Sequence, residues 1–93
     1  MIDAASRPRL AAKARLRYDR QEARYLLLYP ERGLALNGTA VDVVRLCTGE
    51  RTVAGIVDEL AGKYTDRPRG VVEREVLTFL AALADRGLVH AEP

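Results

Sequence analysis

The chain has 93 residues, 48% of them hydrophobic and 30% charged, which is enough for one small globular domain and no more. Its single cysteine excludes an internal disulfide, and no apolar run approaches the roughly 18 residues that a membrane-spanning helix needs. The N-terminus lacks the apolar stretch of a secretory signal, so the sequence predicts a cytoplasmic protein that does not associate with a membrane.

The net charge of +2 is unevenly distributed. Residues 1–24 contain seven basic and three acidic side chains, whereas the rest of the chain contains eight basic and ten acidic ones. Proteins that bind nucleic acid neutralise phosphates with a basic face. The helices predicted below all lie in the acidic part, so nucleic acid is not an expected partner.

Three strands are predicted before residue 38. Residues 13–19 alternate between apolar and polar side chains, which is typical of a half-buried strand. Residues 24–29 are apolar on both faces and rich in tyrosine and leucine, which favours a central strand. Pro30 has no N–H and ends that strand, and residues 34–37 form a short third strand at the edge of the sheet.

Three helices follow the strands. Asn37 and Thr39 are both plausible N-caps of the first helix, and Gly49 fits the left-handed residue that follows many helix ends. Thr52 caps the second helix, and the third runs over about residues 71–86.

The order of these elements predicts the fold class. It is α+β and winged-helix-like, with a three-stranded antiparallel sheet followed by three helices. Residues 1–10 show no apolar periodicity and predict a flexible N-terminal arm, so the domain proper is expected over residues 11–90.

The chain offers little for catalysis. The lone histidine, His90, lies three residues from the C-terminus, and Cys47 lies on an apolar stripe with no basic neighbour to stabilise a thiolate. No glycine motif for a nucleotide is present, and a second cysteine or histidine for a zinc site is lacking. We expect no catalytic residue, no metal and no cofactor.

Two kinds of binding protein remain open. A winged-helix DNA-binding regulator would present basic and amide side chains on its third helix. That helix instead exposes a mixture of acidic, basic and neutral polar side chains: Glu73, Arg74, Glu75, Thr78, Asp85 and Arg86. The alternative is a peptide-binding domain, in which the edge strand accepts an extended peptide and the third helix forms the opposite wall of a groove. The apolar arc of the third helix is wider than one core-facing stripe requires, so one margin of it could face a partner or complete the core.

A family resemblance bears on this choice. The run "LLLYPERGLALNGTAVDVVRLCTGERTVAGIVDELAGKY", followed by "VVEREVLTFLAALADRGLV", resembles coenzyme PQQ synthesis protein D (PqqD). The resemblance covers about Arg9 to Val89, with one departure at Thr48, where an acidic residue is expected. Its matching pieces are Pro30-Glu31, Leu36-Asn37, Thr39-Ala40, Gly49 before "RTV", Ile56, Leu60 and "FLAALADRGLV".

The resemblance implies a peptide chaperone of pyrroloquinoline quinone (PQQ) biosynthesis, without catalytic activity of its own. Such a recognition element for ribosomally made, modified peptides binds the PQQ precursor peptide. It presents the peptide to a radical S-adenosylmethionine (SAM) enzyme, which cross-links a glutamate and a tyrosine within it. The DNA-binding regulator remains the alternative function.

The resemblance also implies the binding residues. The peptide is expected to add a strand beside Leu34, Ala35 and Leu36, and to pack on Val72, Glu75, Val76 and Phe79. Val76 lies deep in the apolar arc, which favours a place in the core, whereas Val72 and Phe79 lie on its margin and could equally contact the peptide or the core. Glu75 could be solvated or meet a basic peptide residue. An exposed edge strand also favours a homodimer.

Overall fold

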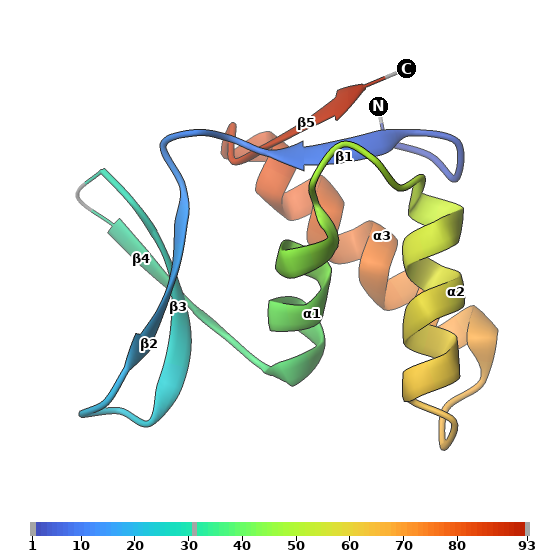
Figure 1. Ribbon diagram of the computed structural model, residues 1–93, viewed down its shortest axis with the longest axis horizontal. Helices are drawn as coiled ribbons and strands as arrows, with labels where there is room; N and C mark the ends of the chain where they lie inside the picture. Colours follow the sequence, from blue (N-terminus) through green and yellow to red (C-terminus); the bar gives the residue numbers. More distant parts are fainter. Residues whose placement is uncertain (1, 31, 93) are drawn as a thin grey trace.

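The structure, a computed structural model, describes residues 2–30 and 32–92 and contains two small antiparallel sheets and three helices. The larger sheet has the order β2-β3-β4, formed by Arg15–Asp19, Arg24–Tyr29 and Arg32–Leu36. Figure 1 shows this sheet on one side of the three helices. The predicted fold class and strand order are confirmed. The third strand begins at Arg32, earlier than predicted, and Glu31 of the expected turn lies outside the described residues.

The two faces of the larger sheet have different environments. Leu27 at the centre of β3 points toward the helices and is fully buried. Its neighbours Leu26 and Leu28 point the opposite way because side chains alternate along a strand, and they are only half-buried. One face of the sheet therefore completes the core, and the other is left uncovered by the helices.

The three helices are α1 (Gly38–Leu46), α2 (Val53–Lys63) and α3 (Arg69–Asp85). The side chain of Asn37 accepts a hydrogen bond from the Ala40 N–H at 2.8 Å, so Asn37 is the N-cap of α1 and Thr39 lies inside the helix. The predicted cap of α2 is also confirmed, because Thr52 accepts from the Gly55 N–H at 3.1 Å. Such caps satisfy N–H groups that have no partner within the helix.

The smaller sheet was not expected from the sequence. It pairs β1 (Arg7–Leu10) with β5 (Val89–Glu92), where the sequence predicts a flexible arm and a short exit. The opposite edge of β1 is also occupied, because the Leu10 N–H donates to the Cys47 carbonyl at 2.9 Å and the Gly49 N–H donates to the Pro8 carbonyl at 2.9 Å. Gly49 has a φ of +84°, but it lies two residues after Cys47, the C-cap of α1, and so is not the residue that directly follows the helix end as predicted. A Cβ at Gly49 would lie 2.7 Å from the Arg9 guanidinium. Residues 7–10 are therefore a paired strand rather than an unpaired arm.

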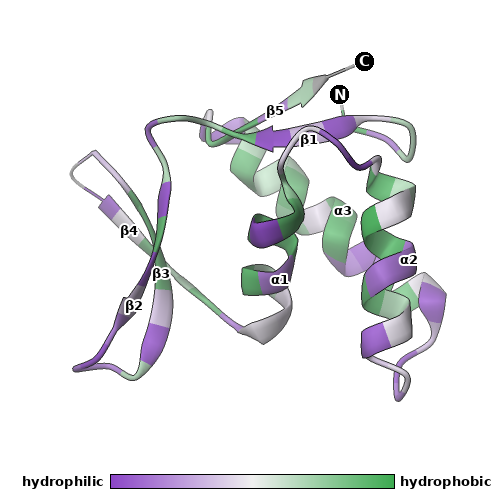
Figure 2. Cartoon of the chain, viewed as in Figure 1, coloured by the Kyte–Doolittle hydropathy of each residue, from purple (hydrophilic) through white to green (hydrophobic). Residues whose placement is uncertain are grey.

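The core lies where the sheet and the helices meet. Figure 2 shows hydrophobic residues concentrated in the helices, and hydrophilic residues along β1 and the turn between β2 and β3. Among the described residues, no helix is both long enough and apolar enough to span a bilayer. The large side chains with less than 2% exposure are Pro8, Leu27, Val43, Val53, Ile56, Val57, Val72, Val76, Leu80, Leu83 and Leu88.

Candidate peptide-binding groove

The edge of β4 offers backbone groups to an added strand. β4 pairs with β3 on one side, and no other strand of the described chain flanks it. Tyr29 is the register partner of Arg32. In hairpins with a connection of this length the closing pair is generally hydrogen-bonded, and we expect this of Tyr29 and Arg32. Hydrogen-bonded and non-bonded pairs alternate along an antiparallel ladder. By this alternation we infer that the N–H and C=O groups of Gly33 and Ala35 point away from β3, and both residues are exposed.

A groove lies between the N-terminal half of α1 and the middle of α3. Its volume is about 560 Å³, and apolar side chains form much of its surface. Glu75, Thr78, Phe79 and Ala82 recur at steps of three and four residues, so they form one continuous face of α3. The lining residues are Asn37, Thr39, Ala40, Val43, Arg67, Arg74, Glu75, Thr78, Phe79 and Ala82.

The predicted site residues separate into two groups. Glu75 and Phe79 line the groove, and Ala35 is exposed on the edge strand. Leu36 is 7% exposed and packs in the core, with Leu34 partly buried against it. Val72 and Val76 are completely buried in the core, so they offer no surface to a peptide. Both valines therefore belong to the core and not to the groove, because the face of α3 that carries them packs against the other elements of the domain.

A network of polar contacts fixes one end of the groove. The Arg67 guanidinium donates to Glu75 Oε2 at 2.6 Å and to Thr39 Oγ1 at 2.9 Å, which links α3 to α1. The same guanidinium lies over the Tyr64 ring, 4.6 Å from its centroid. Arg67 is thus held on three sides, and its charge neutralises that of Glu75.

Tyr64 extends this network to α1. Its hydroxyl donates to Asp42 Oδ2 at 2.6 Å, and the Lys63 ammonium donates to the same oxygen at 2.9 Å. Partial burial opposes ionisation of Asp42, but these hydrogen bonds and the charges of Lys63 and Arg45 hold the pKa of Asp42 below its ordinary value. The hydrogen bond to Asp42, together with desolvation, raises the pKa of the Tyr64 hydroxyl. The pair therefore behaves as an ionised acceptor and a neutral donor.

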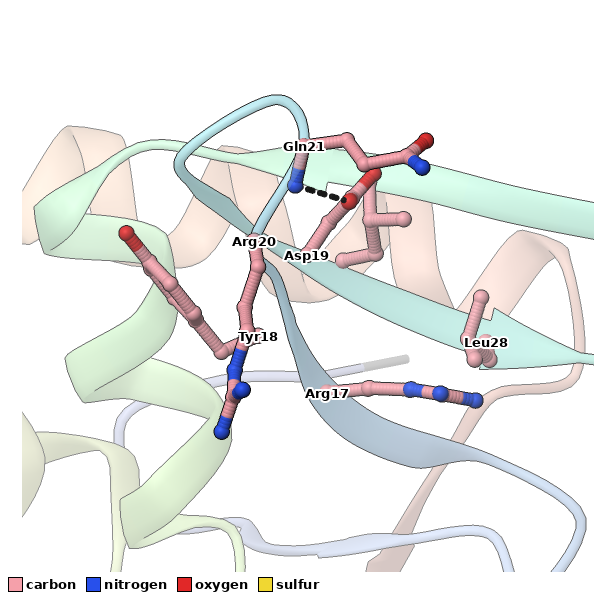
Figure 3. A pocket seen from close by; sticks show the side chains of 7 residues that line it. Arg17, Tyr18, Asp19, Arg20, Gln21 and Leu28 are labelled. Carbon is pink, nitrogen blue, oxygen red and sulfur yellow. Dashed lines mark hydrogen bonds between the residues drawn. The ribbon is translucent and has the colours of Figure 1, made fainter.

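A larger hollow lies elsewhere, on the hairpin of β2 and β3. It measures about 710 Å³ and is lined by the hairpin's own residues. Figure 3 shows Arg17 and Leu28 on one side of the hairpin and Tyr18 pointing to the other, with Asp19 accepting from the Gln21 N–H at 3.0 Å. None of its lining residues belongs to β4 or to a helix. The hollow adjoins β2, which is the other edge strand of the sheet, but no helix forms a wall beside it, so the groove beside α3 remains the better candidate.

The side chains with catalytic or metal-binding potential do not converge. His90 is exposed on β5, whereas Cys47 is buried, and desolvation raises the pKa of its thiol to about 12. Within residues 2–30 and 32–92, no group of three or more His, Cys, Asp or Glu side chains is placed to hold a metal ion.

The sequence pattern missed several residues of the groove. The helical pattern predicts a capping role for Asn37 and Thr39 but no place in a groove, and Arg67 joins Thr39 across 28 positions of the chain. Periodicity within one helix cannot show a contact of that kind. The recurrence of Thr78, Phe79 and Ala82 along α3 was the signal that could have identified this wall.

Comparisons with known proteins identify the family of this chain. The family model described as coenzyme PQQ synthesis protein D (PqqD) matches residues 24–89. A "PqqA binding protein" of Rhodopseudomonas palustris (strain BisB5) is 42% identical over 88 residues, which cover 95% of this chain and 85% of that protein.

Two solved structures extend the comparison. The PqqD truncation of Methylobacterium extorquens PqqCD, described as a functional and stand-alone recognition element for ribosomally synthesised, post-translationally modified peptides, superposes with a TM-score of 0.81 at 33% identity. The match covers 97% of this chain and 95% of that one. The crystal structure of PqqD from Xanthomonas campestris gives a TM-score of 0.58 at 31% identity, covering 95% and 97% of the two chains.

Proposed function

Because this chain belongs to the PqqD family, we propose that it binds the precursor peptide of PQQ biosynthesis as an added strand on β4. The observation that carries this proposal is the open edge of β4 close to a largely apolar groove. Peptides that extend a sheet gain affinity from main-chain hydrogen bonds and specificity from pockets for alternate side chains. The chain offers both kinds of contact.

The energies are consistent with this mode of binding. Gly33 and Ala35 together offer four outward backbone groups, and four ladder bonds of about 1 kcal/mol each contribute about 4 kcal/mol. Micromolar affinity requires about 8 kcal/mol. Two or three apolar peptide side chains in the groove, at about 1.5–3 kcal/mol each, supply the difference and offset part of the ordering cost.

The finer role is presentation. We propose that the bound peptide is offered to a radical SAM enzyme, which modifies it while this chain holds one segment. A peptide strand on β4 would have one edge against the domain and the other edge free. That arrangement leaves the rest of the peptide accessible to a second protein.

The direct test is calorimetric titration of the chain with a synthetic precursor peptide. We expect saturable one-to-one binding at micromolar affinity or better, and no binding of a peptide of the same composition in scrambled order. Equal heats from both peptides, or none from either, would contradict the proposed function.

A further inference from the structure

The charges that line the groove are unequal in their availability. Arg67 and Glu75 pair with each other at 2.6 Å, and Arg67 is also engaged by Thr39 and by the Tyr64 ring. The remaining charged lining residue is Arg74, which is exposed and has no hydrogen-bond or ion-pair partner in the described part of the chain. Arg74 is therefore the charged side chain of the groove that could pair with a ligand.

The polar neutral residues of the groove differ in the same way. The side chain of Asn37 caps α1, and the Thr39 hydroxyl already accepts from Arg67. Thr78 is exposed and has no partner among the described residues. It lies four residues after Arg74, so the two side chains are neighbours on one face of α3. A guanidinium and a hydroxyl placed side by side can both donate to one anionic oxygen pair.

We propose that Arg74, assisted by Thr78, forms a carboxylate subsite in the groove, which an acidic residue of the bound peptide occupies. This inference rests on the proposed function, because the ligand is the peptide that adds to β4. Alternate side chains of such a strand point toward the helices, so an acidic residue among apolar ones would reach α3. The sequence suggested that Glu75 could meet a basic residue of the peptide. Because Arg67 already pairs with Glu75, the structure instead favours an acidic peptide residue at Arg74.

The carboxylate could come from an Asp or Glu side chain or from the peptide's C-terminus. We commit to a side chain, because the C-terminus of a peptide held within a longer strand need not lie in the groove. A peptide with an amidated C-terminus separates the two sources. Binding that depends on the free C-terminus would assign the subsite to the terminal carboxylate instead and overturn the side-chain assignment.

The experiment is a thermodynamic cycle between protein and peptide. The protein variants are Arg74→Gln and, as a matched control, Arg86→Gln at the exposed arginine that forms the C-cap of α3, outside the groove. The peptides are the synthetic precursor and versions in which each Asp or Glu is changed singly to Asn or Gln. Circular dichroism checks that each variant keeps its fold.

We expect Arg74→Gln to weaken binding of the unmodified peptide about fivefold to tenfold, an effect that grows at low salt. One acid-to-amide peptide should lose the same factor against the wild-type protein and nothing further against Arg74→Gln. Arg86→Gln should bind every peptide like the wild type.

Two results would overturn the subsite. One is an affinity of Arg74→Gln for the unmodified peptide within twofold of wild type. The other is an Arg74→Gln effect that stays the same for every acid-to-amide peptide, which would show no coupling. A wild-type protein that binds no peptide at all contradicts the proposed function itself, so the two failures are distinguishable.

Discussion

At the scale of single residues, Asp42 is the acceptor on which the α1 end of the polar network depends. It receives the Tyr64 hydroxyl and the Lys63 ammonium on the same oxygen, and only 15% of its side chain is exposed. A carboxylate in this position is stabilised by its donors in the folded state and by water alone in the unfolded state. Asp42 therefore contributes to stability as long as it is ionised.

We predict that Asp42→Asn lowers the free energy of unfolding at pH 7 by about 1–2 kcal/mol. Because the folded-state pKa of Asp42 is lowered, its contribution is fully present above the unfolded pKa of about 3.9 and is lost as the pH falls through the folded value. The difference in the free energy of unfolding between Asp42→Asn and the wild type should therefore become smaller as the pH falls from 5 to 3. Urea unfolding at several pH values measures this.

Asp58→Asn is the matched control. Asp58 pairs with Arg69 on the surface, where the Asp58 side chain is 66% exposed. Its replacement should therefore change the free energy of unfolding little at any pH in this series. A gap for Asp42→Asn that stays constant down to pH 3 would show that the charge of Asp42 is not what stabilises the fold.

At this scale the sequence was informative about residues that act locally. Asn37 and Thr52 could be recognised as caps because a cap needs only its own helix. Cys47 could be recognised as buried because its neighbours at helical spacing are apolar. The burial of Val72 and Val76 could not be distinguished from groove exposure, because only packed neighbours decide which margin of a wide apolar arc is covered.

At the scale of elements, the order of β2, β3, β4 and the three helices followed from patterns of period two and period 3.6. The edge position of β4 was also predictable, because the strand is short and directly precedes a helix. Which of its N–H groups face outward was not, since that depends on the register of the hairpin with β3.

We predict that Ala35→Pro weakens peptide binding at least fivefold without unfolding the domain. Proline removes one outward N–H, worth about 1 kcal/mol of ladder bonding, and its ring hinders the approach of a partner strand. Calorimetric titration measures the affinity, and thermal unfolding measures the stability.

Two further variants serve as controls for Ala35→Pro. Ala35→Ser keeps the N–H and should bind like the wild type. Leu34→Pro removes an N–H that the same register directs at β3, so it should destabilise the sheet. Unchanged peptide affinity in a folded Ala35→Pro protein would reject binding along the edge of β4.

At the scale of the whole molecule, the pairing of β1 with β5 is the feature that the sequence did not reveal. Each strand has four residues, and the partners Arg7 and Glu92 stand at opposite ends of the chain. Neither strand shows enough alternation to be recognised alone, and only the folded helices bring the two together. The contacts of β1 with Cys47 and Gly49 then hold it in place.

The open edge of β4 also bears on assembly. Two copies that paired through their β4 strands would cover the backbone groups that we assign to the peptide. We therefore predict that any homodimer of this kind dissociates as peptide is added. Sedimentation velocity with and without saturating peptide measures the change in mass, and Ala35→Pro should reduce dimerisation in parallel. A dimer that persists with two peptides bound would place the dimer contact elsewhere.

Because β1 and β5 pair with each other, the two ends of the described chain lie close together on the same side of the domain (Figure 1). The residues that line the groove all lie between Asn37 and Ala82, well inside both ends. A second polypeptide fused to either terminus would therefore not replace any residue that lines the groove. Such a covalent tether would hold an enzyme near the bound peptide at an effective concentration in the millimolar range, so that a modular fusion could replace affinity between separate proteins.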